Sequence, residues 1–340
     1  MEKMSKISIS IIGAGKISIE NEFDNYRKKP ASHLGAYLKY YKIFDVRGIY
    51  DLNKNKCRKY CKIFKVNYFE TLDNLLSSNS DIIVLAINYK NNLKVIKHIC
   101  KSKYKPQILF CEKPISNKIS SANQIYNLCK KNKVKLLINN RRLENRYTLA
   151  KKLINRFKKN KIIHISAKSS SGLHSIGIHM IDLLNFYNGK IKYINNVVLN
   201  DKIKKLKYSN NFFKKDPRVL GYFQFYENNA TCSYISTART NYSFFEIEIF
   251  FINFKMIINQ NNNFIEVVKM SNNLKSTLSY KLSKSKKYYI NKNNTLFDNI
   301  AVELNKVFKN KKNKSFLDAE NGLEAYKILD KLSNARKIKN

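Results

Sequence analysis

The sequence lacks tryptophan, long hydrophobic runs and any dense group of cysteines, and each absence excludes a class of protein. Six cysteines scattered over 340 residues fit reduced thiols better than a disulfide framework, which excludes a small disulfide-stabilised scaffold. The longest apolar stretches, 81–87 and 244–258, are short or interrupted by charge, so no membrane span is predicted. The N-terminal residues lack the apolar segment of a signal peptide, and we expect a cytoplasmic protein.

Acidic residues are also scarce, since 24 of them stand against 65 lysines and arginines, for a net charge of +41. Such an excess normally indicates a partner that carries phosphates, either nucleic acid or an anionic membrane surface. Here lysine, asparagine and isoleucine supply 55, 46 and 40 residues, and all three have A/T-rich codons, so a biased genome explains the charge equally well. The lysines are spread along the whole chain and no tryptophan provides a stacking platform, so no specific nucleic-acid partner is expected.

The first part of the chain alternates the patterns of buried strands and of helices. Apolar runs of strand length end at glycine, aspartate or polar residues, and the segments between them carry apolar residues at helical spacing. The predicted strands are 6–12, 44–50, 81–87, 107–111 and 134–138, and the predicted helices are 53–64, 91–101 and 120–131. Repeated alternation is typical of a parallel sheet covered on both faces. We therefore predict an α/β fold with a doubly wound Rossmann sheet over residues 1–141.

From about residue 142 the pattern changes to short strands separated by turn residues. Helices are predicted at 147–157 and at about 179–187, and closing helices at 296–309 and 318–332. The predicted strands are 161–166, 219–226, 230–237, 244–251, 255–259 and 264–269. This order predicts an α+β domain for substrate binding and oligomerisation over residues 142–340, built on a largely antiparallel open sheet.

The first predicted strand runs into the sequence GAGKIS, which has the features of a dinucleotide-binding turn. Gly13 permits the tight turn, and Gly15 lets backbone amides approach a pyrophosphate at a helix N-terminus. Lys16 and Ile17 continue this turn, and we place them in the cofactor site. Ser18 stands where a third glycine or alanine is usual, which weakens the pattern without cancelling it.

Asp51 follows the second predicted strand, where a carboxylate can accept both ribose hydroxyls and repel a 2′-phosphate. This position favours NAD over NADP as the cofactor. The separation of 36 residues between Gly15 and Asp51 exceeds the usual spacing of about 20, so residues 19–32 are predicted to form an added loop. The loop is placed to cover an active-site mouth, and its basic residues at 27–29 suit an anionic substrate, although codon bias explains the lysines equally well.

The sequence Cys111-Glu112-Lys113-Pro114 directly follows the fourth predicted strand. These side chains therefore stand at the carboxyl end of the sheet, where open α/β folds bind ligands. A lysine held there beside a carboxylate can polarise a substrate oxygen or move a proton. We place Glu112 and Lys113 at the cofactor and Lys113 in the catalytic site. The alternative is that Pro114 begins a helix and Lys113 is solvated.

Together these motifs resemble the Gfo/Idh/MocA oxidoreductases, the family of glucose-fructose oxidoreductase and myo-inositol dehydrogenase. The resemblance extends over nearly the whole chain and rests on GAGKIS, SHLGAY, the strand-ending aspartate, CEKPIS, NNRRLEN, SSGLHSIGIHMIDLL, FYENNATCSYIS and DAENGLEAYKIL. In that family the lysine of the EKP motif and a histidine on a helix of the second domain flank the substrate carbon that exchanges hydride with nicotinamide. The resemblance implies Lys113 and His179 for these roles.

His179 and Asp182 are three residues apart, so on a helix they share one face. A neutral imidazole suits removal of a hydroxyl proton as hydride leaves the same carbon. We expect His179 to act as the acid/base and Asp182 to bind a substrate hydroxyl, with Lys113 as the polarising partner of the histidine. The alternatives are a hydrogen-bonded core histidine and a carboxylate on the helix surface.

One departure from the family pattern lies four residues before this histidine, where Ser175 replaces a usual aspartate and His174 is adjacent. A serine cannot hold an imidazolium or accept a proton as a carboxylate does. Either His174 takes part of that role, or the hydrogen-bond network differs, or the chemistry is slow. We retain both residues as substrate-binding candidates, and a surface position for His174 is an equal alternative.

Further matches are less specific. Residues 87–89 read Ile-Asn-Tyr where the family usually has Thr-Pro-Asn, and the backbone of Asn88 is expected to line the nicotinamide. His33 is expected to pack a helix or anchor a loop. Arg141 or Arg142 is expected to clamp a substrate carboxylate or phosphate, with a solvated surface arginine as the alternative, and we retain Arg142 in the substrate site.

We therefore predict an NAD(P)-dependent oxidoreductase, with NAD rather than NADP, that interconverts a secondary hydroxyl and a ketone on a sugar, cyclitol or nucleotide-sugar-like substrate. The alternative is a catalytically impaired nucleotide-binding sensor or scaffold of the same fold. An open sheet presents one face for burial and relatives commonly pair through it, so a homodimer or homotetramer is expected. Cys57 and Cys61 can share a helix face, but no second ligand pair lies nearby and no metal site is expected.

Overall fold

The computed structural model describes residues 5–170, 172–199, 218–237, 240, 242–271, 282–310, 314–333 and 337–338. Ser171 of the SSGLHS motif lies outside the described residues. The chain forms two compact units that interleave in sequence: the first contains residues 1–144 and 292–323, and the second contains 145–291 and 324–340. Residues 292–323, which the sequence pattern assigns to the second domain, thus belong to the first unit.

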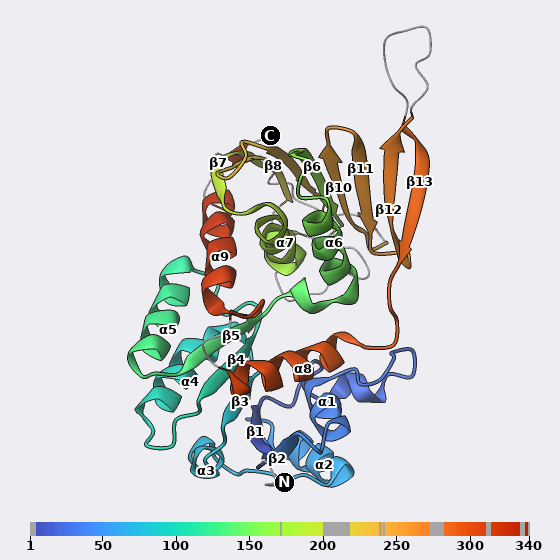
Figure 1. Cartoon of the computed structure of the whole chain (residues 1–340). Helices are drawn as coiled ribbons and strands as arrows, with labels where there is room; N and C mark the ends of the chain where they lie inside the picture. The colour runs from blue at the N-terminus through green and yellow to red at the C-terminus, as the bar shows by residue number, and fades with distance from the viewer. Residues whose placement is uncertain are drawn as a thin grey trace, which may run out of the picture. The chain divides into compact units, whose positions relative to one another are not determined.

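The first unit is built around a five-stranded parallel sheet (Figure 1). Its strands are β1 (Ile7–Ile12), β2 (Phe44–Tyr50), β3 (Ile82–Leu85), β4 (Ile108–Glu112) and β5 (Lys135–Asn139). They lie in the order β2-β1-β3-β4-β5, and every neighbouring pair is parallel. Strands β1 and β3 are buried throughout because helices cover both faces, which explains their continuous apolar runs. The predicted doubly wound sheet is confirmed.

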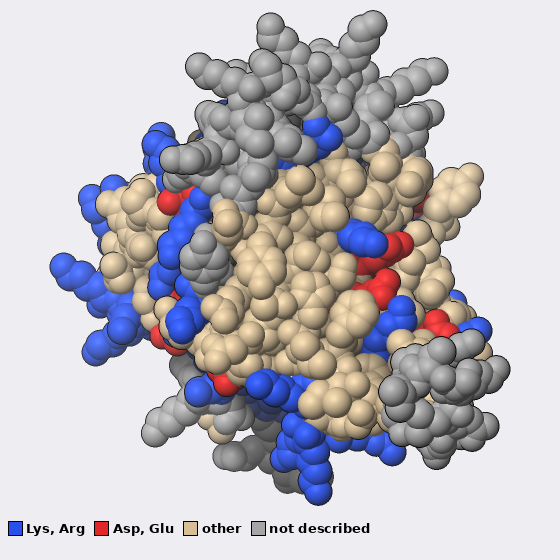
Figure 2. All heavy atoms as spheres, turned by 90° about the horizontal axis from the view of Figure 1, so that it is seen from above, with Lys and Arg blue, Asp and Glu red and all other residues tan. Residues whose placement is uncertain are grey.

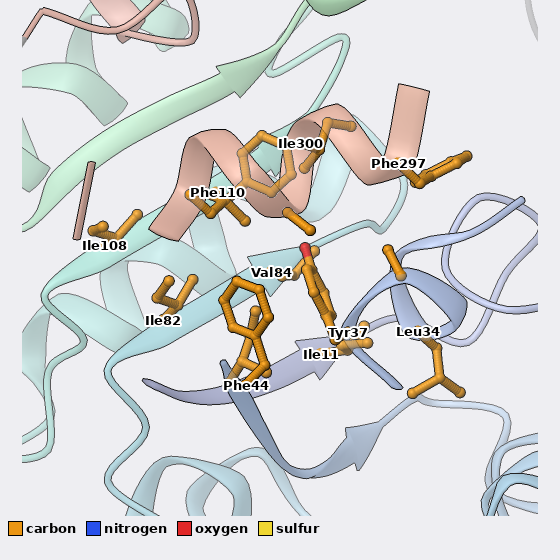
Figure 3. Close-up of a cluster of buried hydrophobic side chains, with 14 of the residues drawn as sticks. Ile11, Leu34, Tyr37, Phe44, Ile82, Val84, Ile108, Phe110, Phe297 and Ile300 are labelled. Atoms are coloured by element: carbon orange, nitrogen blue, oxygen red, sulfur yellow. The ribbon is translucent and has the colours of Figure 1, made fainter. Parts of the chain in front are cut away.

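Helices from two distant parts of the chain cover this sheet. They are η1 (Glu20–Phe23), α1 (His33–Lys39), α2 (Lys54–Phe64), α3 (Leu72–Ser77), α4 (Tyr89–Lys101), α5 (Ile119–Lys131), η2 (Arg141–Leu143) and α8 (Leu296–Lys309). On one face α1 and α8 bring Tyr37 and Phe297 into an apolar cluster with Phe110 of the sheet (Figure 3). On the other face α4 and α5 pack together (Figure 1). The apolar cluster that contains Tyr37, Phe110 and Phe297 explains why α8 belongs to the first unit.

The second unit contains a nine-stranded sheet in the order β13-β12-β11-β10-β6-β9-β8-β7-β14. Its strands are β6 (Ile162–Ser169), β7 (Ile191–Leu199), β8 (Arg218–Phe225), β9 (Thr231–Ser236), β10 (Phe245–Phe251), β11 (Phe254–Asn259), β12 (Phe264–Met270), β13 (Leu282–Tyr289) and β14 (Lys337–Ile338). Neighbours are antiparallel except β6 with β9 and β7 with β14. The prediction of a largely antiparallel sheet is confirmed.

One face of this sheet is covered by helices. The helical segments are α6 (Asn145–Arg156), η3 (Leu173–Gly177) and α7 (Ile178–Asn188), and α9 (Ala319–Ser333) begins in the first unit and ends in the second. Strand β10 alternates, because Phe245, Ile247 and Ile249 are buried while Glu246 and Glu248 point the other way. The ring of Tyr147 on α6 lies 5.8 Å from that of Phe245. The helices therefore cover the face to which the apolar residues of β10 point.

The opposite face, which we call the open face, carries outward side chains of β6, β8, β9, β10 and β11. Leu220, Tyr222 and Ile235 on it are exposed, and Phe250 and Ile257 are half-buried. Figure 2, which looks onto the side of the second unit where β6, β8 and β10 lie, shows a continuous uncharged area bordered by basic side chains and by a smaller number of acidic ones. Such a face is typical of a sheet that has one side available to a partner.

Several elements were not predicted. Strand β13 contains five polar or charged residues in the sequence LSKSKK and lies at the edge of the sheet, where lysines protect an exposed strand from pairing with another chain. Strand β7 and the short helices α1 and α3 were also missed. Each lacks the clean periodicity on which the prediction depended.

Candidate functional site

The polar residues singled out in the first unit follow the carboxyl ends of its parallel strands, and these ends align at one edge of the sheet. Ile12 pairs with Tyr50 and with Leu85, and Glu112 pairs with Asn139. Since the chain passes from β2 on one side of β1 to β3 on the other, the point where such folds bind ligands lies between β1 and β3. The residues that follow these strand ends are Gly13, Asp51, Asn88, Lys113 and Asn140.

The two glycines of the turn after β1 have different roles. Gly13 has a φ of +107°, and a Cβ at this position would lie 2.4 Å from the carbonyl oxygen of Ala86, so only glycine fits. A Cβ on Gly15 would meet no atom within 4 Å, so this residue faces open space. The space in front of Gly15, beside the backbone of Lys16 and Ile17 at the start of a helical turn, fits the pyrophosphate of a dinucleotide.

Residues 19–32 form the predicted insertion, and the two ends of this loop lie close together. The first two backbone N–H groups of α1 donate to the carbonyl oxygens of Ile17 and Ser18, at 3.1 and 3.0 Å, so the start of α1 is joined directly to the residues before the loop. The loop supplies 14 of the 36 residues between Gly15 and Asp51, and the remaining 22 match the usual spacing of about 20. The spacing between the glycine turn and the strand-ending aspartate is therefore the usual one once the insertion is set aside.

Asp51 connects the glycine turn to the start of α2. One carboxylate oxygen accepts the backbone N–H of Ala14 at 2.6 Å, and the other accepts that of Asn53 at 2.7 Å. Each oxygen keeps a further lone pair, so the side chain can also accept ribose hydroxyls. The carboxylate thus stands at the position that binds ribose in dinucleotide-binding folds.

Glu112, at the end of β4, is held by two buried side chains. Its Oε1 lies 2.6 Å from Nε2 of His33 on α1 and accepts from Nδ2 of Asn139 on β5 at 2.7 Å. His33 is fully buried, and its Nδ1 lies 3.4 Å from the hydroxyl of Tyr37, whose pKa burial and the charge of Glu112 raise well above its usual value. His33 packs α1 and anchors Glu112. Asn139 was not anticipated, although its place at the end of β5 was the available signal.

Lys113 is half-buried at the same edge of the sheet, and a cis peptide bond joins it to Pro114. The backbone carbonyl of Ile115 accepts a hydrogen bond from Nδ2 of Asn92 on α4 at 3.0 Å, which fixes the segment after the lysine. The alternative that Pro114 begins a helix is wrong, because α5 begins at Ile119.

Other predicted residues at this edge are engaged to different extents. The side chain of Asn88 caps α4 by accepting the backbone N–H of Lys90 at 3.1 Å. The side-chain oxygen is thus used within the fold, and the backbone of Asn88 is the part that we assign to the ligand. Arg141 makes a two-pronged ion pair with Glu144, at 2.5 and 3.0 Å, which makes it a poor candidate for the substrate clamp. Arg142 is 4% exposed, so the alternative of a solvated surface arginine is wrong for this residue.

In the second unit, His179 and Asp182 lie one turn apart on α7. Every residue of this helix except Asn185 is buried, so α7 is a core helix rather than an amphipathic one. His179 is 6% exposed and Asp182 is fully buried, so the alternative of a surface carboxylate is wrong. An imidazole and a carboxylate on one face of a buried helix form a polar pair in an apolar setting, where their interactions with a ligand would be strong.

His174 and Ser175 lie in η3, the turn that leads into α7, and both are half-buried. The hydroxyl of Ser175 donates to the backbone carbonyl of Gly172 at 3.2 Å. Where family members carry an acid, this chain thus has a hydroxyl that stabilises the local turn. The intermediate exposure of His174 leaves both of its interpretations open.

The basic side chains of the insertion bind groups of the first unit itself. Arg27 pairs with Asp24 at 2.9 Å, and the ammonium of Lys29 donates to two backbone carbonyls of the loop at 2.8 and 2.9 Å. Lys28 donates to the backbone carbonyls of residues 292–293. These cations tie the loop down, and the expectation that they attract an anionic substrate has no support in the contacts.

The first unit also contains a pair of buried thiols, since Sγ of Cys57 and Sγ of Cys61 lie 4.0 Å apart on one face of α2. Within the described ranges, no three His, Cys, Asp or Glu residues are grouped as a metal ion would require. Over the same ranges, none of the helices combines the length and the apolar character needed to cross a bilayer.

The family comparison matches the first unit. Residues 7–140 match the model of the GFO_IDH_MocA family, described as an oxidoreductase family with an NAD-binding Rossmann fold. Among curated proteins, none matches the chain. The match confirms the expected resemblance over the first five strands, which contain the glycine turn, the strand-ending aspartate and the EKP motif.

Solved structures extend the likeness of fold to the whole chain. UDP-N-acetylglucosamine 3-dehydrogenase from Acidithiobacillus ferrooxidans is 13% identical, with a TM-score of 0.74 over 97% of both chains. The WlbA dehydrogenase from Bordetella pertussis, in complex with NADH and UDP-GlcNAcA, is 13% identical, with a TM-score of 0.71 over 97% of this chain and 96% of that one. A super-repressor mutant of Gal80p from Saccharomyces cerevisiae is 16% identical, with a TM-score of 0.76 over 97% and 95%.

Proposed function

We propose that the protein is a dehydrogenase that interconverts a secondary hydroxyl and a ketone, because residues 7–140 match the NAD-binding Rossmann domain of the Gfo/Idh/MocA oxidoreductase family. The observation that carries the proposal is the position of the glycine turn, Asp51 and Lys113, which follow the ends of β1, β2 and β4 in one aligned parallel sheet. A dinucleotide-binding turn and a lysine suited to polarise a substrate oxygen thus share one edge of one sheet.

The cofactor site in this proposal is made of strand-end residues of the first unit. The backbone of the glycine turn would hold the pyrophosphate, and the Asp51 carboxylate would hold the ribose. The nicotinamide would be bordered by the backbone of Asn88 and by the Glu112-Lys113 segment. The residues assigned to the cofactor are Gly13, Gly15, Lys16, Ile17, Asp51, Asn88, Glu112 and Lys113.

Bound NAD would supply the hydride acceptor, which no side chain of the chain can replace. The ammonium of Lys113 donates a hydrogen bond to the substrate oxygen and lowers the cost of charge developing on it. The imidazole of His179 removes the hydroxyl proton as the ketone forms, and returns it in the reverse direction. Asp182 accepts a hydrogen bond from another substrate hydroxyl. Arg142, His174 and Ser175 are further substrate-binding candidates.

The proposed substrate is a sugar, a cyclitol or a nucleotide sugar. Two structures with the same fold bear the names of dehydrogenases that act on or bind UDP-sugars, and this supports a polyhydroxylated substrate here. Such a substrate has adjacent hydroxyls. One of them would react beside Lys113 and His179, and another would donate a hydrogen bond to Asp182. The choice among the three classes depends on side chains around the substrate that the fold alone does not dictate.

We also propose that the chain forms a homodimer or homotetramer through the open face. Two copies with a net charge of +41 repel each other over most of their surface. The open face is an exception, because Glu246, Glu248 and Lys255 are mixed there with Leu220 and Tyr222, and Lys255 pairs with Glu248 at 3.1 Å. A second copy of the same face could approach it without large repulsion and bury its apolar side chains.

The proposal is tested by binding and turnover measured separately. NADH binding is followed by fluorescence, which no tryptophan obscures, and sugars, cyclitols and nucleotide sugars are then screened for a change in nicotinamide absorbance. We expect turnover to fall roughly a hundredfold or more in Lys113→Ala and in His179→Asn, while the affinity for NADH changes by less than about threefold. Lys118→Ala, at an exposed lysine of the same segment, is the control and should keep full turnover.

Full turnover in Lys113→Ala would remove that residue from the chemistry. Failure of the unchanged protein to bind NADH or NADPH would remove the dinucleotide site altogether. Tight binding without turnover of any polyol or sugar would support a second candidate, a nucleotide-binding sensor. That candidate is favoured by Ser175, which replaces an acid, and by the likeness of fold to a structure whose name is that of a repressor.

A further inference from the structure

The insertion at residues 19–32 lies along α2, the helix that starts directly after the ribose-binding position of Asp51. The ring of Phe23 in the loop packs against Tyr60 and Phe64 of α2, with ring centroids 5.4 and 5.6 Å apart. This apolar contact, together with the ion pair between Glu20 and Lys56, fixes the first turn of the loop on the helix. The insertion is therefore a wall beside the region where the adenosine ribose would bind.

Glu20 is the residue of the loop that reaches toward this region. Its Oε1 accepts hydrogen bonds from the ammonium of Lys56 at 3.0 Å and from the hydroxyl of Tyr60 at 3.2 Å. The side chains of Lys56 and Glu20 are 32% and 28% exposed, so the pair is partly shielded from water. The carboxylate therefore holds the lysine in one place rather than leaving it free in solvent.

Lys56 is the third residue of α2, and it is connected to the ribose position through the helix start. Asp51 accepts the backbone N–H of Asn53, and the side chain of Asn53 accepts that of Lys56 at 3.1 Å. Burial lowers the pKa of the Lys56 ammonium, but the hydrogen bond and charge of Glu20, with a contribution from Asp51, raise it by more. Lys56 therefore lies where the carboxylates of Asp51 and Glu20 both act on it.

The other cations in the first five residues of α2 are also paired with a carboxylate. Glu70 binds Lys54 and lies 2.8 Å from Nη2 of Arg58, and these two hydrogen bonds lower the pKa of Glu70 to about 2. In a chain with 65 basic and 24 acidic residues, acids are thus matched to cations at this helix start. The match matters because a 2′-phosphate on the ribose would need cations and a helix N-terminus close to Asp51.

We propose that Glu20 is a specificity-determining residue for the dinucleotide: by holding Lys56, it denies a cation to the 2′-phosphate of NADP and so sets a preference for NAD. The inference rests on the dinucleotide site of the proposed function. It assigns a role to the insertion, which the family pattern leaves unexplained. Asp51 discriminates by direct repulsion of the phosphate, whereas Glu20 discriminates by occupying the lysine that would otherwise offset this repulsion.

The test compares binding of NADH and NADPH to the full chain by fluorescence titration. The unchanged protein should bind NADH about tenfold or more tightly than NADPH, and Glu20→Gln should tighten NADPH binding about fivefold to tenfold while NADH binding changes less than twofold. The gain should shrink at high salt because it depends on an accessible charge pair. Glu324→Gln, which removes a carboxylate paired with Lys327 on α9, changes the net charge equally and should alter neither affinity.

A second variant shows whether the gain depends on the released lysine. In the double variant Glu20→Gln/Lys56→Gln the gain in NADPH affinity should disappear, whereas Lys56→Gln alone should leave NADPH binding unchanged because the lysine is already held. An unchanged NADPH-to-NADH ratio in Glu20→Gln, or a gain that survives in the double variant, would overturn the role of Glu20 and leave the dehydrogenase proposal intact. Absence of binding of either dinucleotide to the unchanged protein would overturn both.

Discussion

The two sheets of this protein differ in where their candidate functional residues lie. The five-stranded sheet is parallel and covered on both faces, so its functional candidates lie only where strands end. The nine-stranded sheet is largely antiparallel, and its candidates, His179 and Asp182, lie on the helix α7 that covers it. A sheet buried on both sides has only its edge for a ligand, whereas a sheet covered on one side keeps a whole face for a partner.

The largest effect is expected from a change in the glycine turn, at the carboxyl end of the parallel sheet. Gly13→Ala places a side chain at a φ of +107° and 2.4 Å from a backbone oxygen, so we expect the free energy of unfolding to fall by about 3 kcal/mol and NADH binding to be lost. Gly15→Ala meets no protein atom within 4 Å, so it should leave stability within about 0.5 kcal/mol of the original.

The Gly15→Ala protein should still lose roughly tenfold or more in NADH affinity, because the new methyl group occupies the space assigned to the pyrophosphate. Urea denaturation and NADH titration measure the two effects separately. Equal destabilisation by both substitutions would mean that the space before Gly15 is already filled by protein. Unchanged NADH affinity in Gly15→Ala would mean that the pyrophosphate binds elsewhere.

The same contrast explains which parts of the fold could be predicted from the sequence. Residues 81–87 form a continuous apolar run because β3 is buried on both faces, and that run was sufficient to predict the strand. In the antiparallel sheet the alternation of β10 was equally clear. Strand β13 could not be predicted, because it lies at the sheet edge and carries lysines instead of an apolar pattern.

The candidate site was predictable where the chain order dictates position. The ends of parallel strands meet at one edge, so the grouping of Asp51 and Lys113 followed from the order of elements. The hydrogen bond between the side chains of His33 and Glu112 could not be predicted. It joins residues that are 79 positions apart in the sequence, and the directions of their side chains depend on tertiary packing. Likewise, the burial of Asp182 depends on α7 being buried on nearly all sides, which its sequence spacing alone did not decide.

A smaller effect is expected from a substitution on the open face, where it should weaken the association of two copies. We expect Leu220→Lys to raise the dissociation constant of the homo-oligomer about tenfold or more, because two new charges would be buried in each symmetric contact. The fold should be unaffected, since this side chain is 43% exposed in the single chain. Ile63→Lys, at a 50% exposed position on α2, is the control and should not change assembly.

Analytical ultracentrifugation over a range of protein concentrations measures this dissociation constant. A monomeric unchanged protein would show that the open face is not used by a second copy. Dissociation by Ile63→Lys as readily as by Leu220→Lys would place the contact on the first unit instead.

The smallest expected effect concerns α8, the helix through which the late part of the chain joins the first unit. The buried carboxylate of Asp298 accepts the backbone N–H of Thr295 at 2.8 Å and binds the ammonium of Lys39 at 2.6 Å. Burial raises the pKa of this carboxyl, but the bonds from Lys39 and Thr295 lower it by more, so that it lies below its usual 3.8 in the folded protein. The charge therefore stabilises the fold above about pH 4 and ceases to do so as the pH falls through the folded pKa.

We accordingly expect Asp298→Asn to lower the free energy of unfolding by about 1 kcal/mol at pH 7, and the difference from the unchanged protein to narrow at pH 3. Urea denaturation at the two pH values measures it. Asp24→Asn is the control, because its exposed pair with Arg27 should contribute no measurable stability. A difference that is equal at both pH values would show that the shape of Asp298, rather than its charge, holds α8 on the parallel sheet.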